Sequence, residues 1–407
     1  MTLERMSHGL AGALAGAALL MAVSGCAEVS PSATSNNGPS QSSSASSTPD
    51  EHAAAWTATG AMIEARTFHT ATVLSNGTVI AAGGASMAGS GDALSSAELY
   101  DPSSESWTAI GTMMGARAYH TATLLPDGTV LVAGGTTSSG SGDALASAEL
   151  YDPISESWTA IGTMMRARAY HTATLLPDGT VLVAGGTTSG VVQASAELYD
   201  PGTGSWTATK NMVGVRSGHT ATLLPDGTVL VAGGSSSATA SGTVASAELY
   251  DPSSGSWTAT GTMVEARSGH TATLLPDGTV LVAGGIMSSY LPSPVASAEL
   301  YDPSSESWTA TGNMDADRAF HTATLLPDGK VLVAGAFSTG IDALVSAELY
   351  DPSTGEWTVT GDMDGARAGH TATLLPDGEA LLAGGVNLNG TADALASAQL
   401  YDPGSAT

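Results

Sequence analysis

The chain has 407 residues, more than one ordinary core accommodates, so its length predicts several domains or one array of repeats. Only 11 lysines and arginines stand against 38 acidic residues, a net charge of −27, which argues against binding of nucleic acid or of anionic membranes through basic patches. The single cysteine, Cys26, excludes an intramolecular disulfide and any multi-cysteine zinc or iron–sulfur site.

The first 25 residues have the composition of a signal peptide. Arg5 lies in a short polar start, and residues 10–23 are uncharged and rich in Ala, Leu and Gly. This run is too short to span a bilayer stably, but it suits the apolar core of a signal peptide. Residues 22–26, Ala-Val-Ser-Gly-Cys, resemble the lipobox of bacterial lipoproteins. We therefore predict lipidation of Cys26 and an extracytoplasmic protein anchored to a bacterial membrane. An ordinary secretory peptide with a spare thiol is the alternative.

Residues 26–52 form the next segment, which is mostly Ser with Thr, Pro, Asn and Ala and has no apolar period. This composition predicts a flexible tether, with a reach of about 25–30 Å for a chain of this length. The tether would hold the remaining residues, 53–407, clear of a lipid surface.

From residue 56 onward the chain repeats one unit seven times. The spacing between successive tryptophans is 51 residues from Trp56 to Trp107, 48 from Trp158 to Trp206 and 49 from Trp308 to Trp357. One histidine and one arginine recur with the same spacing. Periods near 50 residues indicate a propeller or a solenoid.

Each unit contains four short apolar runs separated by turn residues. In the second unit the runs cover residues 120–125, 129–135, 147–151 and 157–160, and the turns contain Pro-Asp-Gly and Asp-Pro. Runs of four to seven residues rich in Val, Leu and Thr predict strands, and Pro followed by Asp-Gly favours a tight hairpin. The unit is therefore predicted to be a four-stranded blade.

The Arg-x-x-His start, the double glycine, the tyrosine and the tryptophan of each unit resemble kelch repeats, as in the central domain of galactose oxidase and its relatives. The resemblance covers residues 56–403, with departures at Ala336, Gln399 and Glu379. It implies an all-β, seven-bladed β-propeller of four-stranded blades. Because the first element is a fourth strand around Trp56 and the last is a third strand at Tyr401, the N-terminal strand is predicted to complete the last blade and so hide the sheet edges.

The repeated residues have a structural and a functional interpretation. We expect Trp and Tyr to fill the space between blades and the histidines to be hydrogen-bonded; a ring of histidines around a metal is the alternative, but a seven-bladed channel holds them too far apart. The repeat arginines are expected to pair with the Glu or Gln that opens the third strand; an anion-binding ring is the alternative. These arginines are Arg66, Arg117, Arg168, Arg216, Arg267, Arg318 and Arg367.

Variation concentrates on the face that carries the connections between blades and between second and third strands. Aromatic residues precede the repeat histidine in four units, where the other three have Gly. Aromatic and charged side chains on loops are typical of a recognition surface, although drift of repeat loops is the alternative explanation. The candidate ligand-binding residues are Phe68, Tyr119, Tyr170, Phe320, Tyr290, Phe337, Arg166, Asp315 and Asp317.

The sequence contains no metalloprotease motif, phosphate-binding loop or nucleophile elbow. Galactose oxidase chemistry needs a tyrosine cross-linked to a cysteine, and Cys26 lies in the leader. We therefore predict a monomeric, non-catalytic module without a metal or other cofactor, whose partner is an extracytoplasmic protein, peptide or glycan and whose only membrane contact is the lipid. A kelch-type carbohydrate-active enzyme resembling a mutarotase, and a structural surface protein without a ligand, are the alternatives.

Overall fold

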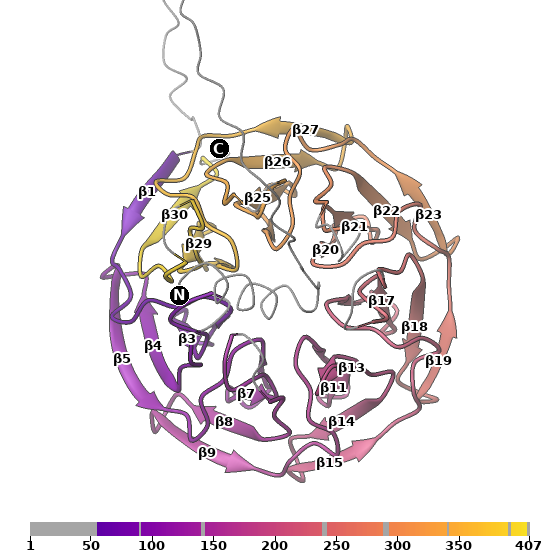
Figure 1. The fold of residues 1–407 in the computed structure, drawn as a ribbon, viewed down its shortest axis with the longest axis horizontal. Helices are drawn as coiled ribbons and strands as arrows, with labels where there is room; N and C mark the ends of the chain where they lie inside the picture. Colours follow the sequence, from indigo (N-terminus) through magenta and orange to yellow (C-terminus); the bar gives the residue numbers. More distant parts are fainter. Residues whose placement is uncertain are drawn as a thin grey trace, which may run out of the picture.

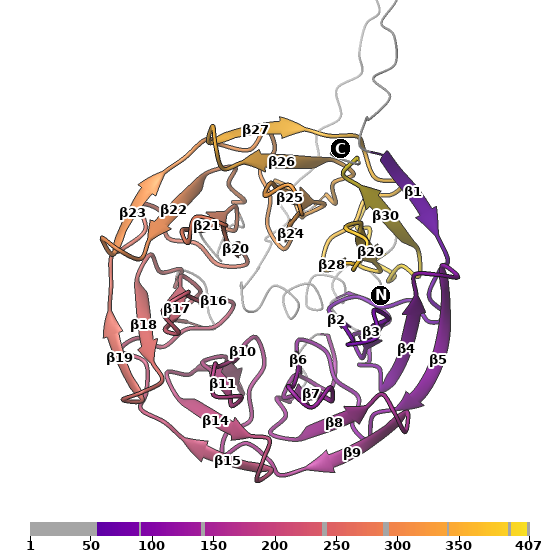
Figure 2. The same cartoon turned by 180° about the vertical axis from the view of Figure 1, so that it is seen from behind.

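Seven four-stranded antiparallel sheets form a closed ring around a central axis (Figure 1). The structure is a computed structural model that describes residues 55–88, 91–139, 143–237, 242–287, 293–339, 342–389 and 392–404. The seven-bladed β-propeller predicted from the sequence is confirmed. In each blade the first strand lies nearest the axis and the fourth lies at the rim, as Figure 2 shows from the opposite side.

The first three blades follow one another from the N-terminal side. Blade one contains β2 (Thr70–Val73), β3 (Val79–Ala82), β4 (Ser96–Asp101) and β5 (Ser106–Thr112). Blade two contains β6 (Thr121–Leu124), β7 (Val130–Ala133), β8 (Ala148–Asp152) and β9 (Ser157–Ile161). Blade three contains β10 (Thr172–Leu175), β11 (Val181–Ala184), β14 (Ala196–Asp200) and β15 (Ser205–Ala208), with a small extra hairpin of β12 (Thr187–Thr188) and β13 (Val191–Val192).

The remaining blades repeat this order. Blade four contains β16 (Thr220–Leu223), β17 (Val229–Ala232), β18 (Ala247–Asp251) and β19 (Ser256–Ala259). Blade five contains β20 (Thr271–Leu274), β21 (Val280–Ala283), β22 (Ala298–Asp302) and β23 (Ser307–Ala310). Blade six contains β24 (Thr322–Leu325), β25 (Val331–Ala334), β26 (Ala347–Asp351) and β27 (Glu356–Val359). Blade seven contains β28 (Thr371–Leu374), β29 (Ala380–Ala383), β30 (Ala398–Asp402) and β1 (Ala55–Thr59).

Blade seven closes the ring by combining both ends of the described chain. β1 pairs antiparallel with β30, so that Trp56 lies opposite Tyr401. The indole Nε1 of Trp56 donates a hydrogen bond of 2.6 Å to the carbonyl oxygen of Gly361 in the connection that follows blade six. The predicted closure by the N-terminal strand is confirmed.

The burial of each strand follows its place in the blade. All four residues of each second strand, such as β7, are buried, because neighbouring blades cover both faces of the sheet there. The sequences of these strands are accordingly apolar throughout, and five blades have Val-Leu-Val-Ala here. The fourth strands at the rim, such as β15, bury Trp206 and expose the residues on either side of it.

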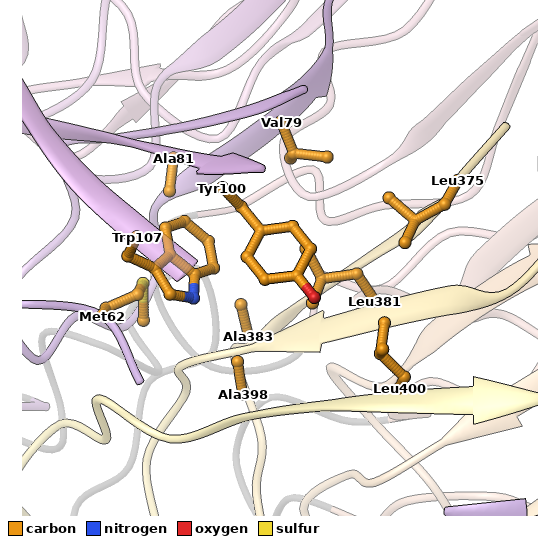
Figure 3. Packing of buried hydrophobic residues seen from close by; sticks show 10 residues of the cluster. All are labelled: Met62, Val79, Ala81, Tyr100, Trp107, Leu375, Leu381, Ala383, Ala398 and Leu400. Atoms are coloured by element: carbon orange, nitrogen blue, oxygen red, sulfur yellow. The ribbon is translucent and has the colours of Figure 1, made fainter. Parts of the chain in front are cut away.

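The hydrophobic core consists of layers between adjacent blades. Figure 3 shows the layer in which Tyr100 and Trp107 of blade one pack against Leu381 and Leu400 of blade seven. The hydroxyl of Tyr100 is 2.8 Å from Thr59 Oγ1, and Nε1 of Trp107 donates to the Gly60 carbonyl at 2.8 Å. The aromatic pair of blade one is therefore satisfied by polar groups at the end of blade seven, whereas Tyr151 and Trp158 of blade two bury their polar atoms without a hydrogen-bond partner.

Alternating strand direction gives the propeller two different faces. We call the face with the connections between blades and between second and third strands the loop face, and the face with the tight hairpin turns the turn face. On the turn face the aspartates cap their own turns; Asp127 Oδ1, for example, accepts from the backbone N–H and the hydroxyl of Thr129. The acidic residues there have a local structural role. No helix long and apolar enough to cross a membrane occurs within the described ranges.

Candidate functional site

The residue before each repeat histidine lies at the mouth of the channel on the loop face, and together these seven residues form a hydrogen-bonded circle. Each backbone N–H donates to the carbonyl of the same position in the preceding blade, over distances of 2.9–3.3 Å. We call this circle the mouth ring. Its members are Phe68, Tyr119, Tyr170, Gly218, Gly269, Phe320 and Gly369.

All seven members of the mouth ring have left-handed backbone conformations, with φ between 54° and 61°. Glycine adopts this conformation without steric cost, which explains its presence in blades four, five and seven. A bulky aromatic residue at positive φ is an outlier that costs on the order of 1–3 kcal/mol. Four blades carry such a strained aromatic residue where three blades show that glycine suffices.

The aromatic side chains of the mouth ring lean over the preceding blade and stack on one another. The ring centroids of Phe68 and Tyr119 are 4.4 Å apart with an interplanar angle of 30°, and those of Tyr119 and Tyr170 are 4.4 Å apart with an angle of 33°. A Cβ added to Gly369 would lie 2.6 Å from Cε1 of Phe68, so the Phe68 ring covers Gly369. Three consecutive aromatic rings thus form an arc on one side of the mouth.

The other side of the mouth is open at blade four. A Cβ added to Gly218 would meet no atom within 4 Å, whereas one added to Gly269 would lie 2.9 Å from Cζ of Phe320. The open position above Gly218 therefore lies between the end of the arc at Tyr170 and the Phe320 ring over Gly269. The mouth ring is asymmetric: blades one to three contribute consecutive aromatic rings, whereas the position at blade four is open.

The two tyrosines of the arc keep their protons at neutral pH. Burial raises the pKa of Tyr119 well above its ordinary value and also raises the pKa of Tyr170. The Tyr119 hydroxyl also donates to the carbonyl oxygen of Ser139 at 3.4 Å. Both hydroxyls are therefore neutral.

The comparisons with known proteins agree with the fold. The model of the KLHDC2/KLHL20/DRC7 Kelch-repeats domain matches residues 34–234 and 170–385, and these overlapping matches cover most of the chain. The chain belongs to the kelch-repeat family. Kelch-like protein 23 of Mus musculus and of Homo sapiens are each 26% identical over 233 residues, which are 56% of this chain and 39% of the relative. Kelch-like protein 34 of Homo sapiens is 37% identical over 87 residues, 21% of this chain and 13% of the relative. The chain thus spans well under half the length of the curated relatives that it matches.

Solved structures share the kelch propeller architecture at low sequence identity. A fungal alcohol oxidase of the AA5 family, in complex with copper, superimposes with a TM-score of 0.70 at 22% identity, over 86% of this chain and 76% of that one. The protein YjhT superimposes with a TM-score of 0.58 at 17% identity, over 74% of this chain and 99% of that one. At these identities the likeness concerns the fold alone.

The histidines of the kelch repeat join neighbouring blades around the channel. In every blade the histidine Nε2 lies 2.9–3.1 Å from the Oγ1 of a threonine in the first strand of the preceding blade. Burial, with a further contribution from Arg117, lowers the pKa of His120 to about 3, so this imidazole is neutral. No three His, Cys, Asp or Glu side chains come close enough to hold a metal ion in the part of the chain that is described.

The repeat arginines are buried within their blades. In blades one to six the arginine Nη2 lies 2.6–2.8 Å from Oε1 of the glutamate in the third strand, and both side chains are at most 2% exposed. In blade seven the glutamate is replaced by Gln399, and Arg367 hydrogen-bonds to Gly384 and Ser397 instead. These arginines connect the strands of their own blade.

The other candidate residues have different surroundings. Phe337 is buried (8% exposed) and packs edge-on against Phe320, with centroids 6.0 Å apart, so it supports the Phe320 ring rather than facing solvent. Arg166, Asp315 and Asp317 are exposed, and Asp317 Oδ2 accepts from the Thr339 hydroxyl at 3.4 Å. Tyr290 and Cys26 lie outside the described residues.

One feature of the loop face was missed from the sequence. Each blade has a buried methionine a few residues before its repeat arginine. In the first five blades the residue directly after this methionine is apolar, and 63–72% of its surface is exposed. The corresponding residues of blades six and seven are Asp315 and Asp364. The signal in the sequence is an apolar residue at a repeat position that the structure leaves in solvent. We call this set the apolar arc; it consists of Ile63, Met114, Met165, Val213 and Val264.

Proposed function

We propose that this protein is a non-catalytic binding module that recognises a glycan, peptide or protein through its loop face. The site is centred on the mouth ring, where the open position above Gly218 adjoins the aromatic arc. The ligand would place a flat group, such as a sugar ring or an aromatic side chain, at this position. The observation that carries the proposal is the retention of four aromatic residues in a left-handed conformation that suits glycine.

The backbone strain at the four aromatic residues of the mouth ring supports ligand recognition, rather than random drift of the repeats, as the reason for their presence. Four strained residues cost on the order of 1–3 kcal/mol each, whereas each stacked pair contributes only about 0.5–1.5 kcal/mol. Burial of the rings adds to these contacts and offsets part of the strain of the four backbones. Backbone strain at positions where glycine suffices clusters at ligand-binding sites. Membership of the kelch family is consistent with an interaction module.

The apolar arc supports a ligand larger than one sugar ring. Five exposed apolar side chains lie on consecutive blades, on the same face as the aromatic residues of the mouth ring. Exposed apolar groups gathered on one face mark interaction sites more often than isolated ones do. Arg166, Asp315 and Asp317 would add polar contacts at the edge of the site.

We further propose that the module is a lipid-anchored, extracytoplasmic monomer held to a bacterial membrane through Cys26. In blade seven Ala55 pairs with Asp402, at the turn-face end of β30. The chain thus enters the propeller at the turn face, which supports presentation of the loop face away from the anchor. Replacing Cys26 by Ser should release the protein from membranes in a detergent phase separation. Continued partition of the variant with the detergent phase would contradict the anchor.

The binding proposal is tested with a Tyr119→Gly/Tyr170→Gly double variant. Glycine at these positions copies blades four, five and seven, so we expect the fold to be retained. Binding to the glycans or envelope proteins captured by the wild-type protein on a glycan array or in an envelope pull-down should fall at least about tenfold, roughly 1.4 kcal/mol.

The matched control is Ile154→Ser, which changes an exposed apolar residue (93%) on the turn face and should leave binding unchanged. Wild-type binding by a folded double variant would contradict the site and favour drift. Turnover of a sugar by metal-loaded protein would favour a carbohydrate-active enzyme, and the absence of any captured ligand would favour a structural surface protein.

A further inference from the structure

Blade four shows how the kelch repeat neutralises its buried arginine. Nη2 of Arg216 lies 2.6 Å from Oε1 of Glu248. The same carboxylate accepts from the backbone N–H of Val213 at 2.6 Å, through Oε2, and of Gly214 at 3.0 Å, through Oε1. Oε1 of Glu248 thus accepts hydrogen bonds from both the Arg216 guanidinium and the Gly214 backbone N–H.

In blade seven Gln399 replaces this glutamate, so an amide N–H donor takes the place of one carboxylate oxygen. Oε1 of Gln399 accepts from the Asp364 backbone N–H at 3.0 Å, and Nε2 of Gln399 is buried without a hydrogen-bond partner. Turning the amide over would bring Nε2 against the Asp364 N–H, so either orientation leaves a donor without an acceptor. The side chains of Arg367 and Gln399 are only 2% and 1% exposed, so solvent has little access to them.

The local packing of blade seven is more open than that of blade four. A Cβ added to Gly214 would lie 3.5 Å from Oε1 of Glu248 and 3.6 Å from Nη2 of Arg216. A Cβ added to Gly365, the matching residue of blade seven, would meet no atom within 4 Å. Space is therefore present beside Gly365 where the other blades hold their charge pair.

The charge of Arg367 is left without a carboxylate partner among the described residues. Burial lowers the pKa of Arg367 to about 10, and exposed Asp364 partly opposes this shift. The guanidinium is still protonated at neutral pH. A buried cation without a counter-charge is strongly unfavourable, so this position favours binding of an anion.

We propose that blade seven binds a small monovalent anion, with chloride as the physiological candidate, between Arg367 Nη2, Gln399 Nε2 and the backbone N–H of Gly365. The anion replaces the glutamate oxygen of the other six blades. Gln399 lies opposite Ala58 of β1 across the seam. Occupation of the site therefore stabilises the blade in which the ring closes.

The test is the thermal unfolding of the full chain in sodium chloride and in sodium gluconate at equal ionic strength, because gluconate is too large for the site. We expect the wild-type melting temperature to be about 1–2 °C higher in 200 mM chloride, the shift that about 1 kcal/mol gives in a domain of this size. The Gln399→Glu variant restores the sequence of the other blades and should melt higher in gluconate without a chloride-specific rise. A chloride-specific rise of equal size in both proteins, or none in the wild type, would overturn the proposal.

A crystal soaked in sodium bromide provides a direct readout. An anomalous peak between Arg367 and Gln399 in the wild type and its loss in Gln399→Glu are expected. A well-diffracting wild-type crystal with no peak there would also overturn the proposal.

Discussion

The ring of Trp56 packs against that of Tyr401 at a centroid distance of 4.9 Å, and this contact joins the two ends of the propeller. In the other blades the corresponding pair belongs to consecutive strands, such as Tyr250 and Trp257 at 4.9 Å. Blade seven therefore depends on a contact that forms only when both ends of the chain meet. The seam is the place where the stability of the ring can be tested separately from that of a blade.

Deleting residues 53–60 should lower the melting temperature and promote aggregation. The deletion removes β1 and leaves the backbone of β30 as an unpaired edge. Trp257→Ala is the control, because it removes a packed indole without opening an edge. It should cost about 3–5 kcal/mol and leave the protein monomeric. Unchanged melting and monomer content after the deletion would show that the ring closes in another way.

Glu248→Gln in blade four should lower the free energy of unfolding by about 3–5 kcal/mol, because it leaves the buried Arg216 without a counter-charge. The substitution reproduces the side chains of blade seven without any change of shape. Urea unfolding followed by tryptophan fluorescence measures the effect. Glu265→Gln, which changes a partly exposed carboxylate 3.5 Å from Arg267, should have a much smaller effect. Equal effects of the two substitutions would mean that burial does not determine the strength of these pairs.

The propeller should lose stability as the pH falls below about 6.5. Burial lowers the pKa of the repeat histidines, to about 3 for His120, His270 and His321, whereas the unfolded chain titrates near 6.5. The unfolded state therefore binds more protons between pH 6.5 and pH 3, and each histidine contributes roughly 1.4 kcal/mol of destabilisation per pH unit in this window. Above pH 7.5 this contribution is absent. The slope of the unfolding free energy against pH, measured from pH 8 to pH 5, gives the number of protons taken up on unfolding, and this number should approach seven. An uptake of less than one proton would contradict buried neutral histidines.

The fold was predictable because the same residues recur at nearly constant spacing. The tryptophan, histidine and arginine positions define seven units, and the phase of the first and last strands defines the seam at Trp56 and Tyr401. The turns carry their own signals in Pro-Asp-Gly or Asp-Pro, and in Ser75-Asn76-Gly77 of blade one. Departures from the pattern were also visible, and Gln399 is the one with the largest consequence in the structure.

The candidate site was predictable in position but not in conformation. The alternation of Gly with Phe or Tyr before the repeat histidine is a sign of positive φ, yet a backbone angle set by hydrogen bonds between blades cannot be derived from one unit alone. Stacking of Phe68, Tyr119 and Tyr170 likewise depends on how neighbouring blades pack. The burial of Phe337 against Phe320 depends on the conformation of a variable loop, for which the sequence has no periodic signal.

Gly218→Ala and Gly369→Ala should differ in stability although the two glycines have nearly the same φ, 59° and 61°. Both variants carry the cost of alanine at positive φ, about 1–2 kcal/mol. Gly369→Ala must also displace the Phe68 ring from a distance of 2.6 Å, which adds roughly 1–3 kcal/mol. The difference between the two unfolding free energies thus reports that the Phe68 ring covers Gly369 whereas the space above Gly218 is open. Equal values would show that the mouth ring is not asymmetric.

Gly218→Tyr should block the proposed site by filling it with the protein's own side chain. Tyrosine at this position would extend the arc beyond Tyr170, because an added Cβ meets nothing within 4 Å. Strain of about 1–3 kcal/mol would be partly offset by a stacking contact of about 0.5–1.5 kcal/mol, so the variant should remain folded. On the same glycan array and in the same envelope pull-down, its binding should fall at least about tenfold. Loss of binding in both Gly218→Tyr and Tyr119→Gly/Tyr170→Gly would place the ligand where the aromatic arc meets the open position above Gly218. If Gly218→Tyr binds as the wild type does while the double glycine variant does not, the ligand contacts the arc from above and leaves blade four empty.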